Sequence, residues 1–436
     1  AGALAAAVVA TSLPGMGVPV FAKTEYPLPY EAADKYTDEN PFIFPTEVNA
    51  LATLEAERAT SLHNDDNGDR PSQNEHYPMK VVLDDDGVTA IHDMASGGRD
   101  YATYAYTAEA GLYEVVANCQ CGSTNTMVLS EENNKIQQVS VSVNETKNGA
   151  TLIWGTSNKF LLVVNESGAG TLKITSATNQ AAPRIDCLKI TKVAQKYVGE
   201  NRFQFPTDST AAVLEAEYGI ITNVSNTDDG NGAWPAKVAT GNWTDNGTGN
   251  GYFVSSVNTG DSVAYAYHAE KPGIYEFTAR YRSGSDDNHY TWSSDNGKIV
   301  AGSVQAGNSG ENAASVTKTK TFKVAVTEAG DGILTFAAPA VASGVKNMAM
   351  TDRFDITLVV DKSALVSAIE EANALALNLD NYEDGETKTA FTTALDAANA
   401  VNTNYTDELT QEQVKTAVTA LNNAKNALVL KTTDIQ

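Results

Sequence analysis

The sequence predicts a mainly β fold: two β-sandwich (jelly-roll) modules followed by a C-terminal three-helix bundle. Two observations support this prediction. First, an internal repeat runs through the chain: the segment LEAE at 54–57 recurs at 214–217, and GLYE at 111–114 recurs as GIYE at 273–276. Second, the spacing of apolar residues changes from two to about 3.6 after residue 361. Segments that recur in the same order indicate one structural unit present in two copies.

The repeated unit has the pattern of short β-strands. Val263, Tyr265 and Tyr267 alternate with other residues, Pro272 and Gly273 provide a turn, and the alternation then resumes. A strand with one buried face shows this period of two. Many short strands joined by turns rich in glycine, asparagine and aspartate are typical of a sandwich or jelly roll. We therefore expect one sandwich in each repeat.

The C-terminal segment shows the helical period in three stretches. Apolar residues recur at helical spacing at Leu365, Ile369, Ala372, Ala376 and Leu379, then at Phe391, Leu395, Ala398 and Val401, and again at Val414, Val418, Leu421 and Leu428. Thr410 and Gln413 have the spacing of a capping box at the start of the third helix. Three helices of similar length with short connections predict an up-down-up bundle.

These patterns divide the chain into six parts. We expect a partial signal peptide at 1–22, a linker at 23–50, the first sandwich at 51–193, a second linker at 194–210, the second sandwich at 211–361 and the bundle at 362–430. The first segment is rich in small apolar residues and ends in a V-x-A-like cleavage pattern, and its prolines and glycines make it a poor membrane span. It predicts a secreted or cell-surface protein.

The charge of the chain limits its partners. The 436 residues carry a formal net charge of −24, which disfavours binding to nucleic-acid phosphates. The same acidity suits an extracellular protein and leaves carboxylates available for calcium. We expect a monomer, with no transmembrane segment.

The chain has three cysteines. Cys119 and Cys121 lie two residues apart in a predicted strand, where a disulfide between them would be strained. A bridge from one of them to Cys187 and three free buried thiols are both compatible with the sequence.

Each repeat begins with two glutamates in the pattern Glu-x-Glu. On a strand, Glu55 and Glu57, or Glu215 and Glu217, would present two carboxylates on one side. Two such charges need a proton or a cation, and calcium accepts several hard oxygen ligands. A solvated polar face is the alternative. A glycosidase pair is disfavoured, because it would require a whole catalytic site to be duplicated in two small sandwiches.

Each β repeat resembles carbohydrate-binding modules of families 6 and 35, and the second repeat is closer. The resemblance lies in its EAE start, Gly251-Tyr252, the GDSVAY segment at 260–265, the PGIYEFTARY segment at 272–281 and the closing Asp355. The two repeats together cover about two thirds of the chain. The C-terminal segment resembles a FIVAR module, a small helical domain of Gram-positive surface proteins and glycosidases, through its leucine and alanine spacing at 395–398 and 420–428.

The resemblance implies which residues bind. It implies a structural calcium held by Glu55, Glu57 and Asp186 in the first module and by Glu215, Glu217 and Asp355 in the second. It also implies that Tyr252 stacks on a sugar, with Trp234 and Trp243 in the loops before it. Arg353 stands where the family commonly has a sugar-binding asparagine; it is either a contact for an anionic glycan or part of an internal salt bridge. In the first repeat we match Tyr252 with Ile91, which puts sugar binding by that module in doubt.

The resemblance implies a non-catalytic glycan-binding region that targets its parent protein to an oligosaccharide or polysaccharide. No P-loop, G-x-S-x-G or H-E-x-x-H motif occurs in the chain. Two alternatives stay open: a surface adhesin with a protein ligand, and accessory modules of a glycoside hydrolase whose catalytic domain lies outside this sequence.

Overall fold

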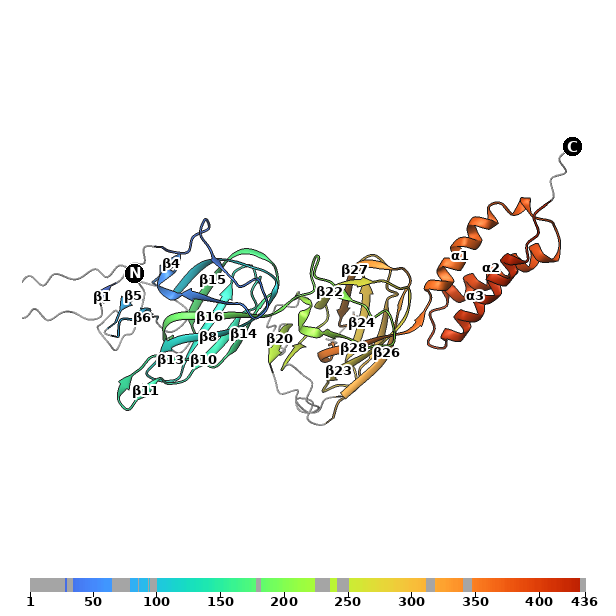
Figure 1. The fold of residues 1–436 in the computed structure, drawn as a ribbon. Helices are drawn as coiled ribbons and strands as arrows, with labels where there is room; N and C mark the ends of the chain where they lie inside the picture. The colour runs from blue at the N-terminus through green and yellow to red at the C-terminus, as the bar shows by residue number, and fades with distance from the viewer. Residues whose placement is uncertain are drawn as a thin grey trace, which may run out of the picture.

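The structure is a computed structural model. It describes residues 28–29, 34–64, 79–84, 86–92, 94, 100–177, 182–223, 236–240, 251–310, 318–339 and 347–431. Figure 1 shows two β-sandwiches and a helical bundle that follow one another along the chain. The mainly β prediction with a C-terminal bundle is therefore confirmed. The predicted signal peptide at 1–22 lies outside the described residues.

The first sandwich consists of two antiparallel-rich sheets. The larger sheet has the order β1-β5-β6-β16-β8-β13, with β14 on β8 and β3 on β16. Its strands are β1 (Leu28–Pro29), β3 (Leu51–Glu55), β5 (Lys80–Leu83), β6 (Thr89–His92), β8 (Gly111–Gln120), β13 (Gly155–Thr156), β14 (Phe160–Val164) and β16 (Arg184–Gln195). The facing sheet contains β2 (Phe42–Ile43), β4 (Ser61–His63), β7 (Tyr101–Ala108), β9 (Asn125–Glu131), β10 (Val139–Val143) and β15 (Gly168–Ser176). A small hairpin pairs β11 (Lys147–Asn148) with β12 (Thr151–Leu152).

The second sandwich repeats this arrangement. One sheet has the order β20-β21-β28-β23-β26 with β18 on β28, and the other has β17-β22-β27-β24-β25 with β19 on β22. The first contains β18 (Ala212–Glu215), β20 (Lys237–Thr240), β21 (Tyr252–Ser255), β23 (Gly273–Arg282), β26 (Lys318–Val326) and β28 (Met350–Asp361). The second contains β17 (Phe203–Gln204), β19 (Ile220–Thr222), β22 (Ser262–Ala269), β24 (His289–Ser294), β25 (Gly302–Gln305) and β27 (Gly330–Ala337).

The period-two alternation places the aromatic residues in the cores. Val263, Tyr265 and Tyr267 on β22 are buried as predicted. Phe336 on β27 and Phe354 on β28 stack with their ring centroids 4.6 Å apart, so the two sheets meet through aromatic side chains. Each sandwich thus buries a large apolar core between its sheets.

Both predicted linkers contain parts of a sandwich core, so the linker prediction is wrong for these parts. Phe42 and Phe44 are buried in the first sandwich, and β2 pairs in parallel with β7. Phe203 and Phe205 are buried in the second, where β17 pairs with β22. The aromatic side chains outweigh the neighbouring prolines, because Phe205 packs edge-to-face on Tyr275 at 4.9 Å. The repeated segment FIFPT at 42–46 and FQFPT at 203–207 carried this signal.

The bundle consists of α1 (Ser363–Ala376), α2 (Glu386–Thr403) and α3 (Gln411–Asn426), with the short turn η4 (Leu379–Asn381) between the first two. Buried residues follow the predicted stripes, among them Leu365, Phe391 and Leu421. The Thr410–Gln413 capping box is present at the start of α3. None of the helices in the described part of the chain is long and apolar enough to cross a membrane.

The modules are in direct contact at both junctions. Leu112, Leu161 and Val163 of the first sandwich belong to the same apolar cluster as the core of the second. The side-chain amide of Gln137 exchanges two hydrogen bonds of 2.9 Å with the backbone of Val238. The bundle's core cluster likewise includes residues of β23 and β28.

The three cysteines are free and buried, which corresponds to the alternative of three free buried thiols rather than a disulfide to Cys187.

Candidate functional site

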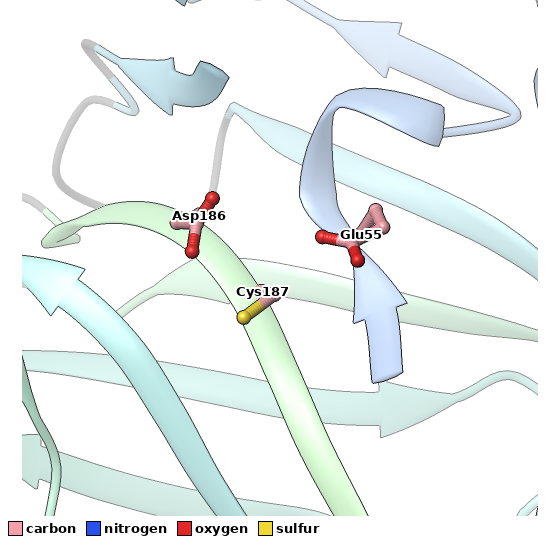
Figure 2. A group of neighbouring side chains, drawn as sticks. All are labelled: Glu55, Asp186 and Cys187. Carbon is pink, nitrogen blue, oxygen red and sulfur yellow. The ribbon is translucent and has the colours of Figure 1, made fainter. Parts of the chain in front are cut away.

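A β-bulge shapes the candidate cation site of the first module. Ile185 on β16 lies opposite Cys119 of β8, and Cys187 lies opposite Asn118, so Asp186 is the extra residue of the bulge. A bulge re-aims side chains that would otherwise point to opposite faces. Glu55, at the end of β3, pairs with Cys187. The possible metal-ligand atoms of Glu55, Asp186 and Cys187 all lie within 4.8 Å of one another. Figure 2 shows these three side chains on neighbouring segments of the chain.

Glu57 completes the acidic group from the turn η1 (Ala56–Arg58). Its Oε2 atom is buried and has no hydrogen-bond partner among the described residues. Burial, and to a smaller extent the neighbouring Glu55 and Asp186, raise the pKa of Glu57 to about 7; a backbone hydrogen bond and Arg58 act in the opposite direction. Burial and Asp186 also raise the pKa of Glu55. Asn118 donates a hydrogen bond of 2.7 Å to Asp186. These oxygens fit a hard divalent cation, which would relieve the crowding of negative charge.

The same bulge recurs in the second module and corrects one predicted ligand. Thr351 on β28 lies opposite Tyr281 of β23, and Arg353 lies opposite Arg280, so Asp352 is the extra residue. Glu215 pairs with Arg353, as Glu55 pairs with Cys187. Asp352 therefore takes the place of Asp186.

The predicted ligand Asp355 lies outside this bulge. It pairs with Thr278 and Val213 in regular register, further along β28. The sequences of β16 and β28 can be aligned in two ways. One aligns the motif Arg-x-Asp, and the other aligns the aspartate together with the buried apolar residue two positions after it. The second match, Asp186-x-Leu188 with Asp352-x-Phe354, is the one that the strand pairing follows. It is the signal that identifies Asp352.

The second site contains two arginines, Arg280 and Arg353, on the strands that form its bulge. Asp352 is fully buried, and its Oδ2 atom lies 3.3 Å from Nη1 of Arg280, which is also buried. Burial and then Asp352 raise the pKa of Glu215 to about 7, against the opposing effect of Arg353. Arg353 forms an ion pair of 3.3 Å with Asp355. The salt-bridge alternative for Arg353 is thus present in the structure.

Tyr252 lies at the boundary between the two sandwiches. It begins β21, is partly buried, and its hydroxyl donates a hydrogen bond of 3.1 Å to Glu114 of the first module. Glu114 also pairs with Lys159 at 2.7 Å. Burial and Glu114 raise the pKa of Tyr252 to about 12.

The hairpin registers correct the match between Tyr252 and Ile91. Ile91 and Val254 each pair with the last strand of their module, opposite Ile185 and Thr351. Two residues earlier in each hairpin, Tyr252 pairs with Thr240 and Thr89 pairs with Leu83. A threonine, not Ile91, therefore stands at the position of Tyr252 in the first module. Trp234 and Trp243 lie outside the described residues.

No family model matches the chain, and no curated protein matches it. Among solved structures, it is similar to a family 35 carbohydrate-binding module from Clostridium thermocellum (21% identity, TM-score 0.26, 34% of this chain and 97% of that one). It is also similar to the family 6 module CBM6cm-2 of Cellvibrio mixtus lichenase 5A in complex with cellotriose (17%, 0.25, 34% and 95%). A third structure is a Paenibacillus xanthan lyase (13%, 0.22, 79% and 28%).

Families 6 and 35 are the two that the sequence motifs resembled. The fold assignment rests on the strand pairing described above. The FIVAR-like nature of the bundle stays a prediction.

Proposed function

We propose that this chain is a non-catalytic glycan-binding region, with a binding surface at Tyr252 on the hairpin β20–β21. One observation carries the proposal: the hydroxyl of Tyr252 is bonded to the carboxylate of Glu114, and that carboxylate in turn pairs with the ammonium of Lys159. Sugars are bound by an aromatic face together with a few polar groups that orient their hydroxyls. Because the Tyr252 hydroxyl is bound to Glu114, the ring face is the part that a sugar would contact.

Retention of the full chain on a panel of immobilised polysaccharides tests this proposal. Tyr252→Ala should abolish retention, because it removes the stacking surface. Tyr252→Phe keeps the ring and removes only the bond to Glu114, so it should retain most of the binding. Equal retention of the alanine variant and the wild type, with unchanged circular dichroism, would rule out this site. If the chain is still retained on a glycoprotein after that glycoprotein has been deglycosylated, the ligand is a protein instead.

We also propose a structural calcium in the first module, as the sequence suggested. Glu55, Glu57 and Asp186 would hold it, and the cation would neutralise their charges. The buried Oε2 atom of Glu57, which lacks a hydrogen-bond partner among the described residues, supports this assignment. Calcium should raise the unfolding temperature of chelator-treated protein, and Glu57→Gln should remove most of that gain.

The proposed setting is extracellular, with the chain acting as a monomer. The acidic net charge of −24 is in keeping with a surface exposed to the medium. Fractionation of cells that express the natural protein, with an antibody against this region, would test the location.

A further inference from the structure

The two bulge sites occupy equivalent backbone positions in the two modules but differ in some of their side chains. The strand registers make Glu215 equivalent to Glu55 and Asp352 equivalent to Asp186. Glu217 follows Glu215 as Glu57 follows Glu55. Around these three acids, however, two positions differ in charge.

Both differences introduce a guanidinium into the second site. Arg280 stands opposite the bulge where the first module has Asn118. Arg353 stands opposite Glu215 where the first module has Cys187, opposite Glu55. Neutral side chains in the first module are thus replaced by two positive ones in the second.

We infer that Arg280 and Arg353 replace the divalent cation in the second module, so that the chain takes up one cation, in the first module. This inference rests on the calcium proposed for the first module. It also departs from the sequence-based expectation of a calcium in each module.

The ion pair between Arg280 and Asp352 is the strongest support for this inference. The two side chains are 5% and 0% exposed and lie 3.3 Å apart. A buried carboxylate needs a compensating charge, and here a guanidinium provides it through an ion pair; neither oxygen of Asp352 has a hydrogen-bond partner among the described residues. A calcium ion bound to Asp352 would sit about 2.4 Å from its oxygens. It would therefore lie beside Arg280, and the two positive charges would repel each other.

A third positive group reaches the second site from the first module. Lys196 is fully buried, and its ammonium donates a hydrogen bond of 2.7 Å to the carbonyl of Gly219, two residues after Glu217. Burial lowers the pKa of Lys196 to about 7, against the raising effect of Glu217. Two guanidinium groups, those of Arg280 and Arg353, and a partly charged lysine thus accompany the acids of the second site, among which Asp355 is paired with Arg353.

The first site has weaker compensation. The charge of Arg58 opposes the rise that burial causes in the pKa values of Glu55 and Glu57, but its Nε donates to the carbonyl of Asp34 and its guanidinium lies over the Tyr36 ring at 4.3 Å. Lys189 is exposed on β16. Asn118 is neutral and satisfies only one oxygen of Asp186. The carboxylates of this site therefore keep a net charge that a cation can balance.

The stoichiometry of calcium binding to the chelator-stripped full chain tests the inference. Equilibrium dialysis should give one ion per chain. Asp186→Asn should abolish this binding, and the matched variant Asp352→Asn should leave it unchanged. Two ions per chain, or a single ion lost in Asp352→Asn, would overturn the inference. No bound ion would overturn both the inference and the proposed calcium, whereas glycan retention, measured separately, reports on the proposed binding function.

A gain-of-binding variant tests the role of the arginines directly. Arg280→Asn with Arg353→Cys gives the second site the side chains of the first, and it should bind a second ion. If this variant fails to fold, hydrogen exchange of the wild type decides the matter. Calcium should then slow exchange in β3, η1 and β16 and leave β18, η2 (Ala216–Tyr218) and β28 unchanged. Equal slowing in both modules would refute the inference.

Discussion

Lys196 and Lys362 occupy the same position in the two repeats and insert their ammonium groups into the module that follows. Each is the first residue after the last strand of its sandwich, and each is fully buried. Lys196 donates to the carbonyl of Gly219 at 2.7 Å. Lys362 donates to the carbonyls of Asn402 and Asn404, at 2.8 and 2.6 Å. The exit strand of each sandwich thus leads directly into the next module without a free linker.

Lys362→Met should weaken the attachment of the bundle. The change leaves the carbonyls at the end of α2 without their donor and removes a cation from the face of the Tyr405 ring, 3.6 Å away. Unsatisfied buried groups cost about 1–3 kcal/mol each, so we expect a loss of about 2–4 kcal/mol in the free energy of unfolding. Urea denaturation measures it.

Lys425→Met is the matched control for this variant. Lys425 forms an ion pair of 2.6 Å with the exposed Glu371. Surface pairs of this kind contribute about 0–1 kcal/mol. Equal losses in the two lysine variants would contradict a special role for Lys362.

The charge of Lys362 predicts a dependence of stability on pH. Burial lowers its pKa from 10.5 to about 8. Between these values the unfolded chain binds more protons than the folded chain, so this group makes the free energy of unfolding rise with pH. Below pH 8 the lysine is charged in both states and adds no slope. The wild type minus Lys362→Met should therefore show a rising difference from pH 8 to 10.5, and a flat difference would refute the shift.

Two equivalent glycines should not tolerate a side chain. A Cβ atom at Gly111 would lie 2.7 Å from the carbonyl oxygen of Ala194, and one at Gly273 would collide with that of Val360. Each glycine begins the strand that pairs with the last strand of its sandwich. Gly273→Ala should destabilise its module by about 1–3 kcal/mol. Gly122→Ala, whose nearest atom would be 3.5 Å away, should change stability little in the same thermal unfolding assay.

The thiols should be unreactive in the folded protein. Burial raises the pKa values of Cys119 and Cys187 to about 12, and that of Cys121 is also raised. The thiolate is the reactive form, so little of it exists at neutral pH. Mass spectrometry after iodoacetamide treatment should find no label on native protein and three labels after denaturation. Rapid labelling of native Cys187 would contradict the burial of its thiol.

Local sequence patterns determined much of this fold. Three features each depend on residues that are near one another in the chain. They are the period of two in β22, the apolar stripes of α1 and α2 that contain Leu365 and Phe391, and the Thr410–Gln413 capping box. Such patterns depend on which side of an element faces a core, so they could be predicted without the partner segment.

Only the tertiary structure decided which residues meet. The motif Arg-x-Asp aligned Asp186 with Asp355, but pairing with the central strand places the bulge at Asp352. A one-residue bulge changes which side chains share a face, and it is fixed by hydrogen bonds to a strand about seventy residues away. The contact of Tyr252 with Glu114 depends in the same way on how two folded modules dock. The sequence by itself therefore determined the repeats and their acidic pairs, and strand register and docking decided the composition of each site.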